Sequence, residues 1–196
     1  MRDWVVDSFR ARIRLNERLV EDKELSKNFL QAHRILVDTI RSGGKILIFG
    51  NGGSAAESQH FAAELVCQFM KQRRPFSAIA LTVDTSVLTA QSNDFGFEHI
   101  FSRQIEALYR KGDAVVGFTT SDINLETKHS LNIYNAFKVA TELGAKRIGF
   151  FSIKTKLLSN MVDVALKVPE TRTDLIQEAH LALIHMFCDR LEQDLS

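Results

Sequence analysis

Several polar and ionisable side chains on two segments of the sequence have types and spacing suited to acid–base or metal chemistry. His60 and Glu64, in "ESQHFAAEL", stand four positions apart, which places them on a common face if the segment is helical. In "LIQEAHLALIH", Gln177 and His185 are about 80° apart around a helix axis, whereas His180 lies roughly 140° from His185. A His–Glu pair with a further histidine can act as general acid and base or bind a divalent metal. The alternatives are a solvated ion pair for His60 and Glu64 and a buried structural histidine for His185.

A glycine-containing loop before the first of these segments is a candidate anion site. The run "GNGGS" (50–54) follows the apolar run "KILIF" and precedes the His–Glu segment. Backbone N–H groups and a serine hydroxyl at such a strand–helix junction can bind an anion. Neither a Walker loop nor GxGxxG is present, so a nucleotide is not indicated. A tight turn that needs glycine for a positive φ is the alternative.

A second loop, "GFTTSD" (117–122), places three consecutive hydroxyls after another apolar run. Neutral hydroxyl donors suit a phosphate monoester, although Ser and Thr also commonly cap helices. Two such loops at one edge of a sheet together favour phosphate binding.

The elements that must position these residues follow from the apolar pattern. Two helices are expected within residues 1–42, ending at Gly43-Gly44. Unalternating apolar runs, typical of buried parallel strands, occur at 45–49, 77–81, 114–118, 147–151 and 164–168. Helix-like segments lie near 54–70, 84–92, 97–109, 130–143, 154–161 and 173–195. The alternation predicts an α/β fold, a three-layer αβα sandwich with a five-stranded parallel sheet and two N-terminal helices. Ligands then bind beyond the carboxyl ends of the strands.

Composition narrows the class of protein. The 196 residues are 45% hydrophobic and 25% charged, which suits one domain with a sizeable core. A formal net charge of +1, evenly spread, gives no electrostatic footprint for nucleic acid or an anionic membrane. Cys67 and Cys188 lack CxxC spacing and are expected to be reduced thiols. No apolar run reaches the ~18 residues of a membrane span, so a cytoplasmic protein is expected.

Taken together, the motifs resemble the phosphoheptose isomerases, enzymes of the sugar-isomerase (SIS) fold that act on sedoheptulose 7-phosphate. The resemblance covers nearly the whole chain and rests on "GGKILIFGNGGSAAESQHFAAEL", "IALTVDTSVLTAQSNDFGFEHIFSRQIEAL", "KGDAVVGFTTS" and "VPETRTDLIQEAHLALIH". It implies a single SIS domain over 1–196, with N-terminal helices at 1–42 and an α/β core at 43–196. The implied reaction converts sedoheptulose 7-phosphate to D-glycero-D-manno-heptose 7-phosphate through an enediol, in heptose supply for lipopolysaccharide or capsule.

The resemblance also implies roles for individual residues. Glu64 and His185 match the family's catalytic pair. The set that holds zinc in some members corresponds to His60, Glu64, Gln177 and His185. The residues that match substrate contacts are Asn51, Gly52, Gly53, Ser54, Glu64, Asp94, Thr119, Thr120, Ser121 and Gln177. Zinc, at one ion per chain, is therefore a candidate cofactor, and the expected assembly is a homotetramer with active sites at subunit interfaces.

The sequence departs from the family pattern in the loop after the third apolar run. The family's T-S-G-N-S is replaced by "TTSDINLETKHS", which adds about five residues and the acids Asp122 and Glu126. Those charges are expected to repel a phosphate dianion, and Ser130 is a candidate replacement for the lost serine. Gln68 and Leu175 stand where the family has arginine, and "FFSIKTKLL" lacks the usual glycine-rich turn.

Three alternatives to a phosphoheptose isomerase follow from the same resemblance. A non-catalytic SIS adaptor, of the type that binds the replication initiator, lacks the glutamate and second histidine, which this chain has as Glu64 and His185. A sugar-phosphate-sensing regulator would carry a helix-turn-helix or basic segment, which the sequence does not show. An isomerase of another sugar phosphate stays open, because loops set the accepted substrate length.

Overall fold

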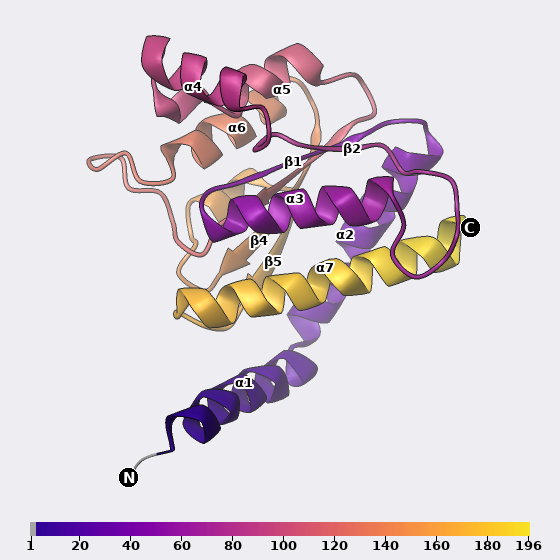
Figure 1. Ribbon diagram of the computed structural model, residues 1–196, viewed down its shortest axis with the longest axis vertical. Coiled ribbons are helices and arrows are strands. Elements are labelled where there is room, and N and C mark those ends of the chain that lie inside the picture. Colours follow the sequence, from indigo (N-terminus) through magenta and orange to yellow (C-terminus); the bar gives the residue numbers. More distant parts are fainter. Residues whose placement is uncertain (1–2) are drawn as a thin grey trace.

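The computed structural model describes residues 3–196 as a parallel β-sheet between two layers of helices (Figure 1). The strands lie in the order β2-β1-β3-β4-β5, and every pairing is parallel. Their bounds are β1 Ile46–Gly50, β2 Ala78–Ala80, β3 Ala114–Phe118, β4 Lys146–Ser152 and β5 Val164–Val168. The α-helices are α1 Trp4–Glu21, α2 Lys23–Arg41, α3 Gly53–Val66, α4 Thr85–Asp94, α5 Ser102–Leu108, α6 Leu131–Glu142 and α7 Thr173–Leu195. This is the predicted αβα sandwich with two leading helices.

The sheet is buried on both faces, as its apolar runs predict. In β1, Ile46 and Ile48 contribute to the core beneath α2, α3 and α7. The alternate residues Leu47 and Phe49 join the second core, beneath α5 and α6. All four side chains are fully buried. Successive side chains of a strand point to opposite faces, so a strand between two cores must be apolar throughout.

Three predicted helices differ from the structure for local reasons. The segment 154–161 is mostly a turn, with a short 3-10 helix only at Leu158–Met161, because Ser152 and Thr155 bond to each other and to nearby backbone. The segment 97–109 divides into a 3-10 helix at Phe97–His99 and α5. The predicted helix 54–70 ends at Val66, where the Arg73 guanidinium binds the carbonyl groups of Glu64 and Leu65.

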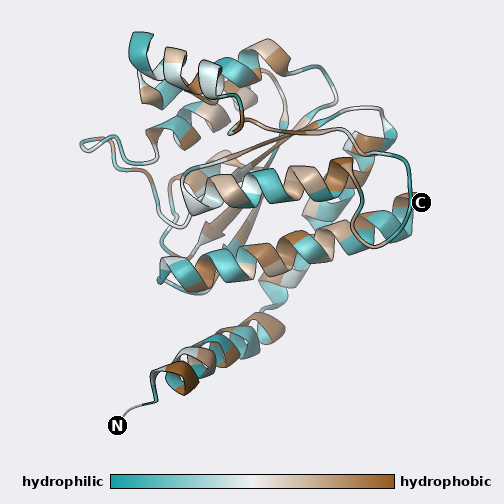
Figure 2. Cartoon of the chain, viewed as in Figure 1, coloured by the Kyte–Doolittle hydropathy of each residue, from teal (hydrophilic) through white to brown (hydrophobic). Residues whose placement is uncertain are grey.

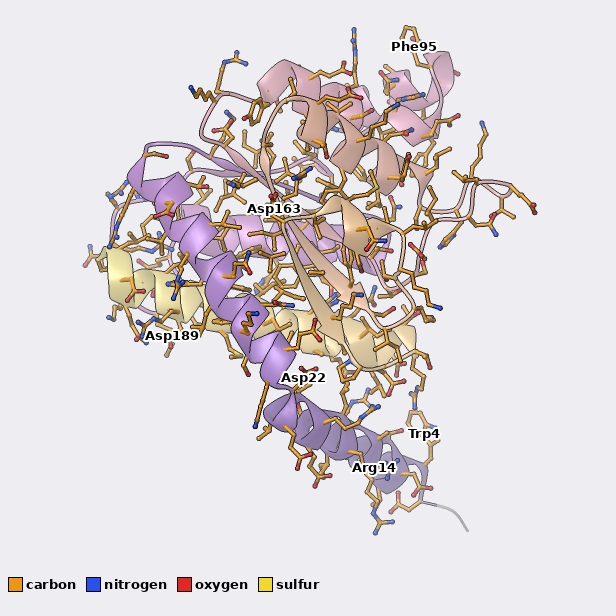
Figure 3. The ribbon with its side chains drawn as sticks, turned by 180° about the vertical axis from the view of Figure 1, so that it is seen from behind. Trp4, Arg14, Asp22, Phe95, Asp163 and Asp189 are labelled. Carbon is orange, nitrogen blue, oxygen red and sulfur yellow. The ribbon has the colours of Figure 1, made fainter. Side chains whose placement is uncertain are left out.

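Helix α1 projects from the rest of the molecule and carries brown, apolar residues on its outer surface (Figures 1 and 2). Only its second half packs closely, where Leu15 joins a small cluster with Val168 and Ile176. Towards its free end Trp4 is 78% exposed and Phe9 is 63% exposed. Figure 3 places Trp4 and Phe95 at opposite ends of the molecule. Within residues 3–196, no helix combines the length and apolar character needed to cross a membrane.

Candidate active site

Helices α3 and α7 lie side by side on one face of the sheet and bring His60, Glu64 and His185 together (Figure 1). The Nε2 atoms of His60 and His185 are 2.9 Å apart. One turn along α3, Glu64 Oε1 lies 3.6 Å from the same His60 nitrogen. The side chains of His60 and Glu64 are 37% and 21% exposed, so the group is open to a ligand. The predicted His–Glu pair and second histidine therefore form one cluster.

The short contact between the two histidines restricts their protonation. A neutral imidazole has one donor and one acceptor nitrogen, so at 2.9 Å one Nε2 must carry hydrogen and the other must accept it. His60 Nε2 faces both the other imidazole and the Glu64 carboxylate. The three side chains thus place a carboxylate beside two hydrogen-bonded imidazoles, the residue types that general acid–base catalysis uses.

The surroundings of His185 are apolar on one side. The ring of Phe69 stacks on the His185 ring, with centroids 5.3 Å apart and planes 18° apart. Cys188, one turn further along α7, is buried, and burial together with the nearby Glu64 carboxylate raises the pKa of its thiol far above the usual value. Cys188 is therefore a neutral thiol rather than a thiolate ligand or nucleophile. Both cysteines are free, as expected.

The loop between β1 and α3 has the geometry of an anion site. Gly52 has a φ of +57°, a conformation that residues with a side chain rarely adopt. The backbone N–H groups of Ser54 and Ala55 donate to the carbonyl groups of Asn51 and Gly52. Within residues 3–196 the N–H groups of Gly52 and Gly53 have no hydrogen-bond partner. Because they stand at the N-terminus of a long helix, they are available to an anion. Gln177 lies against Gly53, where a Cβ would come within 2.3 Å of Gln177 Nε2.

A second helix N-terminus is fixed to this loop by a pair of amide side chains. Asn51 Nδ2 donates to Asn132 Oδ1 at 2.9 Å, and Asn132 Nδ2 donates back to Asn51 Oδ1 at 2.7 Å. Asn132 is buried at the start of α6. Sequence reasoning missed it, because nothing in a lone helical asparagine reveals a partner 81 positions away. The reciprocal bonds hold the N-termini of α3 and α6 next to each other.

The hydroxyl loop after β3 lies at the same edge of the sheet, but its hydroxyls are partly engaged. Thr119 Oγ1 donates to the Ser121 carbonyl at 2.9 Å. Thr120 Oγ1 is 3.5 Å from Thr173 Oγ1 at the start of α7. Ser121 Oγ is 2.7 Å from His129 Nε2, within the inserted segment. Ser130 is buried at the start of α6 with a φ of +56°. A phosphate at Ser121 would therefore meet an imidazole as well as hydroxyls.

The Asp122 carboxylate binds the connection that follows β4, and its repulsion of a phosphate stays a prediction. Its carboxylate accepts hydrogen bonds from the backbone N–H groups of Lys156 and Leu157, both at 2.8 Å, and of Leu158 at 3.3 Å. Burial alone raises the pKa of Asp122, but these N–H groups outweigh it and leave the pKa below its ordinary value. The acid of the inserted loop is thus used to fix the connection between β4 and β5, the other segment that departs from the family pattern.

Two other polar residues lie apart from this cluster. Asp94, at the exposed end of α4, accepts a hydrogen bond from Asn93, and the structure of residues 3–196 gives it no contact with another predicted site residue. His180 and His185 lie on different faces of α7, as the helical spacing predicts, and it is His180 that faces the core. It is fully buried, its Nε2 is 3.2 Å from the Phe151 carbonyl, and its Nδ1 is 3.5 Å from Glu57.

Of the four predicted metal ligands, His60, Glu64 and His185 lie together, whereas Gln177 lies against Gly53. Imidazole and carboxylate donors suit zinc, and two imidazoles on one tetrahedral ion would have nitrogens about 3.4 Å apart. The 2.9 Å between His60 and His185 needs only a small opening to match this. No three His, Cys, Asp or Glu side chains within residues 3–196 form a cluster able to hold a metal. The donor types of His60, Glu64, Gln177 and His185 fit zinc, but the Gln177 side chain lies against Gly53.

Comparison with known proteins agrees with this geometry. Residues 9–152 match the family model of the SIS domain. The chain is 45% identical to the phosphoheptose isomerase of Geotalea daltonii over 97% of both chains. The structure of phosphoheptose isomerase GmhA from Neisseria gonorrhoeae superposes with a TM-score of 0.86, at 40% identity, over 96% of this chain and 97% of that one. The chain belongs to the phosphoheptose isomerase family.

A second solved phosphoheptose isomerase, from Francisella tularensis, superposes with a TM-score of 0.89 at 34% identity, covering 97% of each chain. The resemblance inferred from the sequence is confirmed. The role of each residue in this family member stays a prediction, because it rests on the match between this sequence and the family's motifs.

Replacement of Asp122 tests its anchoring role. Asp122→Ala is expected to lower the free energy of unfolding by about 1–2 kcal/mol at pH 7, the value of charge-assisted bonds reduced for partial exposure. Because the folded pKa of Asp122 lies below its ordinary value, its contribution is present above the unfolded pKa and is lost as pH falls through the folded pKa. Urea denaturation at pH 7 and pH 3 measures both effects. Glu126→Ala, an exposed acid of the same loop, is the control, and an equal loss there would contradict the anchor.

Proposed function

We propose that this protein is a phosphoheptose isomerase, which interconverts sedoheptulose 7-phosphate and D-glycero-D-manno-heptose 7-phosphate. The observation that carries the proposal is the cluster of His60, Glu64 and His185 between α3 and α7 in a chain 45% identical to a phosphoheptose isomerase. The cluster holds a carboxylate and imidazoles open to a ligand, on the two helices whose N-terminal ends adjoin the two candidate anion-binding loops. A non-catalytic adaptor has no need of such a cluster.

The proposed chemistry moves one proton between two carbons of the sugar. Glu64, as base, removes the proton from C1 of the open-chain ketose, which leaves an enediol. The same carboxylic acid returns a proton to C2, so that the C1 carbon becomes the aldehyde. His185 moves the protons on O1 and O2 and assists ring opening, with His60 as its hydrogen-bond partner. The number of protons and electrons is unchanged overall, as an isomerisation requires.

The phosphate is assigned to the loops at the carboxyl ends of β1 and β3. The free amides of Gly52 and Gly53, the side chains of Ser54 and Asn51, and the hydroxyls of 119–121 are its proposed donors. Gln177, whose side chain lies against Gly53, is proposed to contact the substrate. A substrate contact from Asp94, at the end of α4, is also proposed.

His60, Glu64, Gln177 and His185 are proposed as the ligands of a zinc ion, at one ion per chain. When bound there, it would supply a Lewis acid beside the sugar carbonyl. The facing Nε2 atoms of His60 and His185, with Glu64 adjacent, support this assignment.

The proposed setting is the cytoplasm, where the enzyme would supply heptose phosphate for lipopolysaccharide or capsule. The proposed assembly is a homotetramer with active sites at subunit interfaces. An apolar groove of about 570 Å³ between α1, α2 and α7, with Val20, Leu30 and Met186 on its walls, supports assembly because water covers it in a single chain.

The catalytic pair is tested by substitution. Glu64→Gln and His185→Asn are each expected to lower kcat with sedoheptulose 7-phosphate by about 10²- to 10⁴-fold, the usual contribution of a general acid or base. Glu106→Gln, on the exposed side of α5, is the control. Circular dichroism checks that each variant is folded. Wild-type turnover in either variant would remove that residue from the mechanism. Turnover only with a shorter or longer sugar phosphate would support an isomerase of another substrate.

Metal binding is tested on protein purified without chelator. Elemental analysis is expected to find about one zinc per chain, and His60→Ala is expected to lower that content because it removes one imidazole donor. His99→Gln is the control, because this exposed histidine lies outside the cluster. Metal-free protein with full activity would leave the four residues as acid–base and binding groups only.

Assembly is tested by changing the exposed face of α1. The double variant Phe9→Arg, Ile13→Glu is expected to dissociate the tetramer, because it places charges on an apolar surface that an interface would desolvate. Light scattering gives the mass, and Glu17→Lys, at an exposed position on the same helix, is the control. A wild-type protein that is a fully active monomer would contradict both the tetramer and shared active sites.

A further inference from the structure

We infer that Phe69, held in place by a buried Arg73–Glu192 ion pair, is a positioning residue that sets the ring plane of His185. The inference rests on the proposed function, in which His185 moves protons on the sugar oxygens. Phe69 belongs to the 67–73 segment that follows α3, outside the motifs from which the site was predicted. It follows the C-terminal end of α3, whereas the glycine loop precedes the N-terminal end of that helix.

The contact with His185 is face to face. The two ring centroids are 5.3 Å apart and the planes differ by 18°. On its other side the imidazole meets His60 through the single Nε2 contact, with ring planes 73° apart. A hydrogen bond to one nitrogen leaves an imidazole free to tilt about that bond, whereas a flat ring stacked on its face does not. The stack and the hydrogen bond together define one orientation of His185.

Phe69 is itself fixed by a carboxylate from the far end of α7. Glu192 is fully buried, and its two oxygens accept hydrogen bonds from the backbone N–H groups of Phe69 at 2.8 Å, Met70 at 2.9 Å and Lys71 at 2.8 Å. Burial raises the pKa of Glu192, but these N–H groups and the charge of Arg73 outweigh it and keep the pKa below its ordinary value. The backbone that carries Phe69 is therefore bound to an ionised group within the core.

Arg73 connects this carboxylate to α3. Its Nε donates to Glu192 Oε1 at 3.0 Å. Its remaining nitrogens donate to the carbonyl groups of Glu64 at 2.7 Å and Leu65 at 2.9 Å, which end the helix. The guanidinium also lies over the Phe76 ring at 3.9 Å. One buried ion pair thus holds the backbone of the proposed base Glu64 and the ring that stacks on His185.

The test separates orientation from folding. Phe69→Leu keeps an apolar side chain but removes the flat face, and it is expected to lower kcat about tenfold, the low end of the effect of a partner that orients a functional histidine. Because Phe69 follows the end of α3 opposite to the glycine loop, KM is expected to change less than twofold. Phe69→Tyr retains the ring and is expected to restore kcat to within about twofold of wild type. Met70→Leu, at the neighbouring exposed position, is the control.

Nuclear magnetic resonance of histidine-labelled protein provides a readout that does not depend on turnover. The His185 ring protons are expected to be shifted upfield by the Phe69 ring current in the wild type and in Phe69→Tyr, and to lose that shift in Phe69→Leu. A wild-type kcat in Phe69→Leu, an equal loss in Phe69→Tyr, or an unshifted His185 signal in the wild type would each overturn the inference. If the wild type fails to turn over sedoheptulose 7-phosphate, the proposed function fails, while the ring-current shift still decides whether Phe69 orients His185.

Discussion

The close packing of α3 against α7 is the constraint on which the rest of the site depends. Both helices cover the same face of the sheet, and their contact brings His60 within 2.9 Å of His185 although 125 positions separate them. The same contact places Gln177 against Gly53 at the N-terminal ends of the two helices. At their other ends Glu192 and Arg73 form the buried ion pair. Three contacts therefore follow one another along these helices: Gln177 against Gly53, His60 with His185, and the Arg73–Glu192 ion pair.

Each part of this interface has a different physical character, which explains the order of its contacts. Near the sheet edge an anion must come close to free backbone N–H groups. Glycine residues permit this close approach because they carry no side chain. In the middle the side chains are polar and partly exposed, since a ligand must reach them. At the far end the ion pair is buried, and the three backbone N–H groups and the guanidinium satisfy its carboxylate fully.

The sequence predicts best what depends on local spacing. The apolar runs predict all five strands, and the i, i+4 relation predicts the His60–Glu64 contact, because both depend on the geometry of one element. The helical angle also predicts that His180 and His185 point in different directions, as they do. Asn132, Phe69 and Asp122 could not be assigned, since each has a partner chosen by tertiary packing. Asp122 shows this most clearly: its charge suggested repulsion of phosphate, and only the structure reveals that its oxygens accept hydrogen bonds from backbone N–H groups of the next loop.

The bond between Asp122 and the turn after β4 has a consequence for loop grafting. The two segments that differ from the family pattern are physically one unit, because the carboxylate of one satisfies three N–H groups of the other. Transplanting residues 122–130 alone into a relative would leave the Asp122 carboxylate without these N–H partners. Transplanting the turn alone would leave backbone donors without an acceptor. A chimaera that exchanges substrate preference within this fold must therefore carry both segments together.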